Sequence, residues 1–212
     1  MSNETTNPVL KWILIIVACV SILVAIFLAL YSVSEYRAAW KLRARGFTVY
    51  FVKLDDMILH RPITVANNGQ NITLDDCRLI CQLPHLIRLG FVGGNMSGLN
   101  LGEIGNCPRF EIFLCQDVTQ FPADEIRKLA TCPLNSLVLS NVDLEDSDLE
   151  NLMGLTKLEF INLGGNVGIT DASFEYLEKI ASLKNLFLSE TSVTQEGIEE
   201  FKKKRPDVEI HF

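Results

Sequence analysis

The residues whose types and spacing come nearest to a chemical site are Cys77, Cys81 and His85, which recur at every fourth position. On a helix this spacing puts side chains on one face, and thiolate and imidazole groups are ligands for zinc. Pro84 breaks that helix before His85, and the sequence supplies no fourth ligand nearby. We therefore predict buried thiols at this place and no metal site.

Two acidic pairs, Asp55–Asp56 and Asp75–Asp76, have the residue type needed for acid–base catalysis. Neither pair has a nucleophile or a phosphate-binding loop near it, and the glycines at 93–94 lack the lysine of a P-loop. Solvated turns and helix starts explain these carboxylates more simply. We predict that the protein is not an enzyme and uses no cofactor. The alternative, an unrecognised catalytic site, would require a deep polar pocket with carboxylates of perturbed pKa.

The six cysteines do not form a disulfide framework, because Cys19 lies in an apolar N-terminal stretch and the other five are irregularly spaced. Cys107 and Cys132 each precede a proline, five residues ahead of an expected strand. A position that recurs in this way is explained by packing. Buried thiols in a reducing compartment are the simpler interpretation.

The charge distribution argues against a nucleic-acid partner. The net charge is −7, but from Gly46 onward 24 acidic residues face 14 basic ones. A domain with this excess repels a phosphate backbone. No feature of the sequence indicates a small-molecule substrate either.

The stretch 12–34 predicts a transmembrane helix, since it holds 23 residues without a charge. That length suffices to cross a hydrocarbon core of about 30 Å. Trp12 and Tyr31 lie near its ends, where aromatic rings favour the membrane interface. The leader MSNETTNPVLK and the absence of a small-residue cleavage site disfavour a signal peptide.

Basic residues after this stretch predict its orientation. Lys11 precedes it, whereas Arg37, Lys41, Arg43 and Arg45 follow it, which places the C-terminal side in the cytoplasm. Segment 35–46 is expected to continue the helix as a basic juxtamembrane linker. Its cations either meet anionic lipid headgroups or form a plain stop-transfer flank.

From residue 63 the sequence repeats a strand followed by a helix. The first apolar positions of the strands are spaced by 26, 23, 25, 24 and 25 residues, namely Ile63, Leu89, Ile112, Leu137, Ile161 and Leu186. Helical segments are expected between them, at 75–83, 124–130, 147–153, 173–180 and 195–203. Strand followed by helix at such a period is typical of a solenoid. The alternating segments 47–51 and 208–212 suit atypical end units that cover its core.

The best-defined repeat unit resembles the leucine-rich repeat superfamily, in its ribonuclease-inhibitor-like and cysteine-containing types. The matching residues are Leu158, Ile161 and Leu163 in the strand, then Thr170, Asp171, Phe174 and Leu177. Small membrane-anchored repeat proteins look similar throughout. The asparagine that usually follows the strand stands at Asn68 and Asn166 but not in the other units. The resemblance implies an α/β solenoid, with parallel strands on its concave face and helices on its convex face, and a role in binding.

The alternation of side chains along the strands predicts a binding surface. If Ile112 and Leu114 point into the core with their counterparts in later strands, the intervening residues line the concave face. The protein-binding residues predicted in this way are Phe113, Val138, Phe160, Asn162 and Phe187. An exposed apolar patch usually marks a contact surface. The alternative is that neighbouring strands or the N-terminal linker cover it.

Together these patterns predict a single-pass membrane protein with a cytoplasmic repeat domain that binds another protein. Its segments are a tail (1–11), a transmembrane helix (12–34), a linker (35–46), an N-terminal cap (47–62), leucine-rich repeats (63–205) and a capping strand (206–212). The alternative function is a structural subunit or assembly factor of a membrane complex. An apolar patch on the helix side would favour that alternative.

Overall fold

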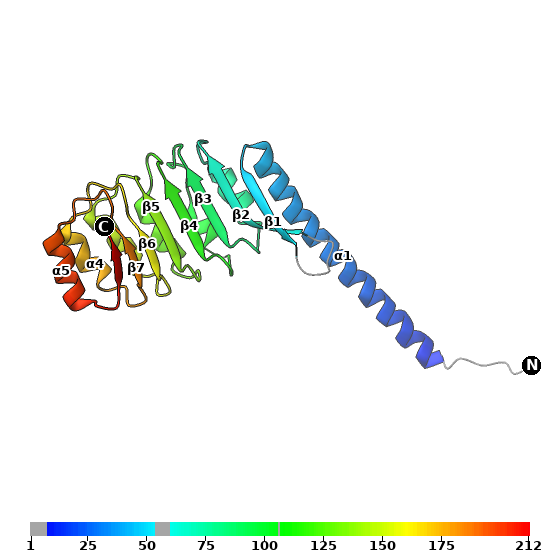
Figure 1. Cartoon of the computed structure of the whole chain (residues 1–212). Coiled ribbons are helices and arrows are strands. Elements are labelled where there is room, and N and C mark those ends of the chain that lie inside the picture. Colours follow the sequence, from blue (N-terminus) through cyan, green and yellow to red (C-terminus); the bar gives the residue numbers. More distant parts are fainter. Residues whose placement is uncertain (1–7, 54–59, 106) are drawn as a thin grey trace, which may run out of the picture.

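The computed structural model describes residues 8–53, 60–105 and 107–212. A long helix, α1 (Pro8–Ala44), leads into an elongated solenoid at whose far end the C-terminus lies (Figure 1). Part of the predicted N-terminal tail and the acidic pair Asp55–Asp56 lie outside the described residues.

The strands that the structure describes form one sheet in sequence order, β1 to β8. β1 and β2 pair antiparallel, and every later pair is parallel. The strands are β1 (Thr48–Lys53), β2 (His60–Asn68), β3 (Arg88–Val92), β4 (Ile112–Gln116), β5 (Ser136–Ser140), β6 (Phe160–Asn162), β7 (Asn185–Phe187) and β8 (Glu209–His211). This order, one strand per repeat with a helical return between parallel strands, confirms the predicted solenoid.

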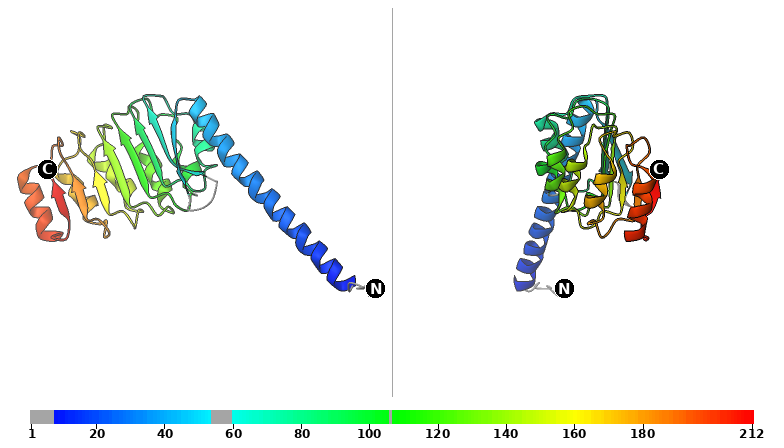
Figure 2. Two further views of the ribbon diagram at one scale, coloured as in Figure 1. Left: turned by 45° about the vertical axis from the view of Figure 1, so that its right-hand side comes forward. Right: turned by 90° about the vertical axis from the view of Figure 1, so that its left-hand side faces the viewer.

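The return segments lie on one side of the sheet and leave its other face open (Figure 2). Several of them are 3-10 helices where the sequence predicts α-helix, as expected for short segments packed side by side. They are α2 (Leu74–Ile80), α3 (Leu101–Ile104), η1 (Ala123–Leu129), η2 (Asp146–Leu152), η3 (Asp171–Ser173), α4 (Phe174–Leu177) and α5 (Gln195–Lys204).

From β2 to β8 the sheet register aligns one core residue of each strand, buried in all of them except β8, where it is half-buried. The aligned residues are Val65, Leu89, Phe113, Leu137, Ile161, Leu186 and Ile210, so the repeat is 24 or 25 residues long. The predicted alignment is wrong at β4, where Phe113 and not Ile112 continues the core. In β2 the partner of Leu89 is Val65, and the side chain of Ile63 is outside the described part.

A residue in the left-handed conformation follows each of the strands β2 to β7 and turns the chain towards the helices. It is glycine in three units and Asp117, Asn141 or Glu190 in the others, with φ between 52° and 81°. The six positions are Gly69, Gly93, Asp117, Asn141, Gly165 and Glu190. The first five donate their N–H groups to carbonyl oxygens of the next repeat over 2.7–3.1 Å. This backbone ladder keeps the turns of adjacent repeats in register.

The asparagine that the resemblance places after each strand is buried in one unit. Asn166 donates to the carbonyls of Leu139 and Leu163 at 2.7 Å, and accepts from the N–H groups of Val142 and Leu144. Val118 and Val142 occupy equivalent buried positions in the two preceding units. The ladder is therefore interrupted, in agreement with the sequence.

The C-terminal part of α1 caps the first repeat. Ala38, Ala39 and Leu42 are buried in the core, and α1 contacts α2, β1 and β2. Arg45 extends this junction, because its Nε lies 2.5 Å from Oδ1 of the buried Asp76. Segment 35–44 continues the helix as expected, with its basic side chains exposed, and in addition its apolar side chains join the core.

The predicted transmembrane stretch at 12–34 falls within α1. Within the part of the chain that the structure describes, no helix has the length and apolar character needed to cross a membrane. The side chains of residues 12, 14–15 and 26–33 lie outside that part.

Candidate protein-binding face

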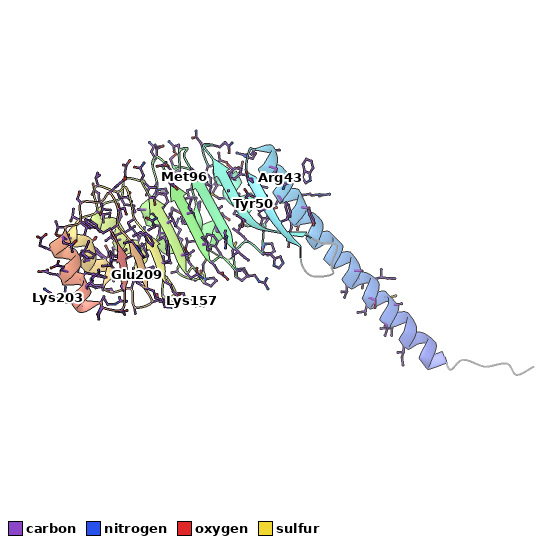
Figure 3. All side chains as sticks on the ribbon, viewed as in Figure 1. Arg43, Tyr50, Met96, Lys157, Lys203 and Glu209 are labelled. Atoms are coloured by element: carbon purple, nitrogen blue, oxygen red, sulfur yellow. The ribbon has the colours of Figure 1, made fainter. Side chains whose placement is uncertain are left out.

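The face of the sheet that points away from the helices carries a band of apolar side chains, which we call the open face. Its half-buried members come from four neighbouring strands: Ile112, Leu114, Val138, Phe160 and Phe187. Polar residues flank them, among them Ser136, Ser140, Asn162 and Asn185. Tyr50 of β1, which is 58% exposed, lies nearer to α1 (Figure 3). An apolar centre with a polar rim is the usual composition of a protein interface.

The structure places four of the five predicted binding residues on this face. Val138, Phe160, Asn162 and Phe187 alternate with the buried residues Leu137, Leu139, Ile161 and Leu186. Whether they bind a protein stays a prediction.

Phe113 is the exception, because its side chain is 0% exposed and lies in the core. Its ring packs edge-on against Phe91 and Phe110, with 6.2 Å between the centroids in both pairs. The sequence alone misleads at β4 because Ile112, Phe113 and Leu114 are all apolar, so alternation does not distinguish the two faces. A second signal exists: Leu86, Phe110, Leu134, Leu158 and Leu183 precede the core positions by three residues and are all buried. Aligning them assigns Phe113 to the core and Leu114 to the open face.

Three rings cluster at the C-terminal end of the open face. Phe160 and Phe187 lie 5.1 Å apart between centroids, and Phe187 stacks on His211 at 4.0 Å. Because Phe187 and His211 are register partners, this contact joins the last two strands. The rings hold each other in place, and a fixed aromatic surface loses little conformational entropy when a partner binds.

A hollow of about 390 Å³ adjoins the rings where the strands end. It is lined by Gln116, Asp117, Ser140, Asn141, Asn162, Gly164, Gly165, Val167, Phe187, Ser189 and Glu190. The carboxylate of Asp117 accepts from Asn141 Nδ2 at 2.8 Å and from Gln116 Nε2 at 3.1 Å. The hollow thus has an apolar side at Phe187 and carboxylates and amides along the strand ends. Sequence reasoning did not identify it, because the six turns align only once the register of β4 is known.

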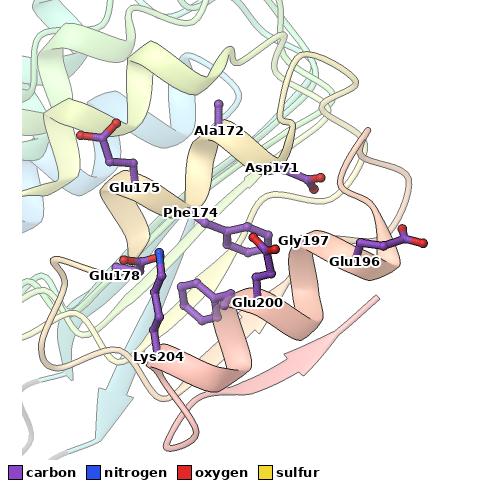
Figure 4. A pocket seen from close by; sticks show the side chains of 10 residues that line it. Asp171, Ala172, Phe174, Glu175, Glu178, Glu196, Gly197, Glu200 and Lys204 are labelled. Carbon is purple, nitrogen blue, oxygen red and sulfur yellow. The ribbon is translucent and has the colours of Figure 1, made fainter.

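A second hollow, of about 430 Å³, lies on the helix side between α4 and α5 (Figure 4). Several carboxylates line it, and Lys204 pairs with Glu178 at 2.7 Å. Asp171 in its wall binds the N–H and the hydroxyl of Thr194 at 2.8 and 2.7 Å, which fixes the start of α5. These contacts join the last two helical segments and give Asp171 and Glu178 a structural role.

Cys77, Cys81 and His85, which the sequence spaces at every fourth position, each contact a different partner in the structure. Cys77 Sγ accepts from the N–H of Asn100 at 3.3 Å, whereas Cys81 Sγ donates to the carbonyl of Arg78 at 3.0 Å. His85 lies 3.8 Å from Glu35 of α1. Burial raises the pKa of the Cys77 thiol to about 11, which disfavours the thiolate that a metal requires. Among the described residues no group of three suitable side chains could hold a metal ion.

Comparison with known proteins gives matches in structure only. No family model and no curated protein sequence matches the chain. A leucine-rich repeat protein of Leptospira interrogans is 23% identical, with a TM-score of 0.47, over 64% of this chain and 33% of its own. The internalin inlF of Listeria monocytogenes is 17% identical, with a TM-score of 0.48, over 69% of this chain and 46% of its own. Internalin C2 of the same organism is 15% identical, with a TM-score of 0.48, over 69% of both chains. This chain therefore spans less than half the length of the first two.

Proposed function

We propose that the chain, whose ladder of parallel strands with helical returns is that of a leucine-rich repeat solenoid, is a binding scaffold without catalytic activity that captures another protein on the open face. The observation that carries the proposal is the apolar band formed by Ile112, Leu114, Val138, Phe160 and Phe187. These residues come from separate repeats and meet only in the folded chain, on a face that the helices leave uncovered (Figure 2). Contiguous apolar surface of this kind marks contact sites.

The helix side offers less support for the alternative of a structural subunit. Among its described residues the exposed large hydrophobic side chains are scattered, with Leu74 and Met153 in different repeats. Single exposed apolar residues are common on soluble proteins. The open face is therefore the surface to test first.

The experiment is site-specific photo-crosslinking in the cells that produce the full chain. A benzophenone side chain replaces Phe160 on the open face or, as the matched control, Met153 on the helix side. We expect a discrete protein adduct from position 160 only, and its loss when Leu114→Ser is added. The melting temperature of Leu114→Ser should stay close to that of the parent. Equal adducts from both positions, or none from position 160, would refute a binding role for this face.

We further propose that α1 anchors the scaffold in a membrane, with the repeats on the cytoplasmic side. Support comes from the sequence, which has no charge over residues 12–34 and basic residues directly after them. Beyond that stretch Trp40 is 74% exposed, beside the exposed Arg37 and Lys41. An aromatic ring with neighbouring cations suits the headgroup region.

Thiol labelling tests this topology. A membrane-impermeant maleimide is applied to intact cells and then to lysed, denatured cells. We expect the repeat-domain cysteines to react only after lysis, and the protein to stay in the membrane fraction after an alkaline carbonate wash. Release by carbonate would contradict anchoring. If the cysteines react in cells that are denatured without lysis of the inner membrane, the repeat domain faces outward and the proposed orientation is wrong.

A further inference from the structure

The loops that follow the strands carry acidic residues and no basic ones, so the edge of the sheet where the strands end is negative. Segments 69–75, 93–99, 117–124, 141–148, 165–171 and 190–196, which comprise these loops and in most repeats the first residues of the next helix, contain no lysine or arginine. Their acidic residues are Asp75, Asp117, Asp124, Asp143, Glu145, Asp146, Asp148, Asp171, Glu190 and Glu196. The opposite edge is mixed: Arg88, Arg109, Lys157 and Lys184 stand there with Glu111 and Glu159, and Lys184 pairs with Glu159 at 2.9 Å. The negative charge along the open face is therefore concentrated where the strands end.

Most of these carboxylates have a structural role at helix starts. Asp146 binds the N–H and hydroxyl of Thr170 at 2.8 and 2.6 Å, and Asp171 binds Thr194 in the same way. Asp148 closes a capping box with Glu145. Others stand in the first turn of a helix, where negative charge is favourable.

Asp117, Asp143 and Glu190 are not part of any such cap. Each is exposed and each has a positive φ, 53°, 58° and 59° respectively. Glycine occupies the equivalent of Asp117 and Glu190 in other repeats and avoids the strain of this backbone conformation. Asp117 and Glu190 line the hollow beside Phe187, whereas Asp143 does not.

Asp117 and Glu190 stand at opposite ends of the hollow. Asp117 follows β4 and Glu190 follows β7 at equivalent turns, so three strand spacings of about 4.8 Å place them about 14 Å apart. In an extended peptide, residues four positions apart are separated by about the same length, at about 3.4 Å per residue, and the side chains of these two residues point to the same face. One basic residue cannot reach both carboxylates, but two residues four positions apart can.

We propose that the open face takes an extended basic segment of the partner, laid across the ends of β4–β7, with two arginines four positions apart. One arginine pairs with Asp117 and the other with Glu190. Asp117 is held by Asn141 and Gln116 and still has free acceptor positions, because a carboxylate accepts about four hydrogen bonds. Arginine suits both sites because its planar fork binds a carboxylate in bidentate fashion. Its methylene stem can cover the Phe187 side of the hollow. This inference rests on the proposed function of the open face.

The test selects ligands without knowledge of the natural partner. The full chain is panned against a display library of random short peptides, and clones are kept only if they lose binding to Phe187→Ser. We expect the surviving sequences to share two arginines four positions apart. The isosteric double variant Asp117→Asn, Glu190→Gln should not select this pair. The matched control Asp143→Asn, which removes an exposed carboxylate outside the hollow, should select it as the parent does.

The selected peptide is then synthesised with citrulline, which keeps the shape of arginine but not its charge. Each replacement should weaken binding about two- to fivefold, as for an exposed ion pair, and added salt should reduce the difference. Peptides that depend on Phe187 but lack the basic pair would overturn this inference and leave the proposed function intact. Failure to select any peptide that depends on Phe187 would count against the proposed function as well.

Discussion

The ring of Phe187 stacks on the imidazole of His211, with 4.0 Å between the centroids and 16° between the planes. The two residues are register partners in β7 and β8, so this contact lies on the open face at the last strand pair. β8 has three residues and pairs only with β7 among the described strands. The side-chain contact therefore supplements a short ladder of backbone hydrogen bonds.

A double-mutant cycle measures this contribution. We expect Phe187→Ala and His211→Ala to be coupled by about 0.5–1.5 kcal/mol of unfolding free energy, the usual range for stacked rings. Urea unfolding of the two single variants and the double variant gives the coupling. Phe187→Ala combined with Met153→Ala, on the helix side, serves as the uncoupled control. A Phe187–His211 coupling near zero would mean that the rings do not stabilise the sheet.

Neighbouring residues in β4 should respond very differently to truncation. Phe113→Ala removes a fully buried ring and should cost about 3–5 kcal/mol of unfolding free energy, whereas Leu114→Ala on the open face should cost well below that. Guanidinium unfolding monitored by circular dichroism measures both. A larger loss from Leu114→Ala than from Phe113→Ala would invalidate the register of β4.

The same strand shows how far the sequence determines this fold. The repeat length, the helical returns and the terminal caps follow from apolar spacing, because each repeat must bury one face against its neighbours. Where both faces of a strand are apolar, as in β4, alternation leaves two registers open and the wrong one places Phe113 on the surface. Only the buried residue three positions earlier, Phe110, settles the choice.

The sequence predicts those parts of the candidate site that depend on alternation within one strand, but not those that depend on contacts between repeats. Phe160, Asn162 and Phe187 follow from strands in which polar or aromatic residues alternate with aliphatic ones, and Val138 follows from the serines two positions before and after it. His211 was assigned to a cap, and its contact with Phe187 depends on the twist and pairing of the last strands. The hollow near Asp117 depends on turns that are far apart in sequence and are brought together by the backbone ladder. Local patterns contain no information on such contacts.

Gly197 in α5 is a position where alanine should destabilise a helix. Alanine ordinarily stabilises a helix by about 1 kcal/mol relative to glycine. Here an added Cβ would lie 2.2 Å from Oδ1 of Asp171, the carboxylate that binds Thr194. We expect Gly197→Ala to lower the unfolding free energy by about 1–3 kcal/mol, measured by thermal unfolding. Gly90→Ala is the control, because its Cβ would meet only Leu114 at 3.8 Å, and it should change stability little. A more stable Gly197→Ala protein would show that Asp171 moves aside at no cost.

The buried thiols should make the protein sensitive to alkali. Burial raises the pKa of Cys77 and Cys132 to about 11 and that of Cys107 to about 12, from an ordinary value of 9.0. Well below pH 9 the thiols are protonated in both the folded and the unfolded chain. Their contribution to the unfolding free energy is then fully present. As the pH rises from 9 towards 11, the unfolded chain loses protons that the folded chain keeps, and the unfolding free energy falls by at most about 1.4 kcal/mol per pH unit for each thiol.

Urea midpoints at pH 8 and pH 10 test this, with the triple variant of Cys77, Cys107 and Cys132 to alanine as the comparison. The triple variant should be less stable at pH 8 but should lose less between the two pH values. The same loss in both proteins would assign the alkaline effect to other groups.

Glu190→Gly should separate stability from binding. Glu190 holds a φ of 59°, which costs an L-residue about 1–2 kcal/mol and glycine almost nothing. Glycine also raises the conformational entropy of the unfolded chain, which costs about 0.5–1 kcal/mol, so the net effect should lie between neutral and about 1.5 kcal/mol of stabilisation. The same change removes a carboxylate from the hollow and should weaken binding of the selected basic peptide about two- to fivefold. Thermal unfolding and peptide titration on the same samples measure the two effects, with Asp143→Gly as the control that shares the positive φ but not the hollow. A variant that binds as well as the parent would show that Glu190 is not part of the binding surface, whatever its effect on stability.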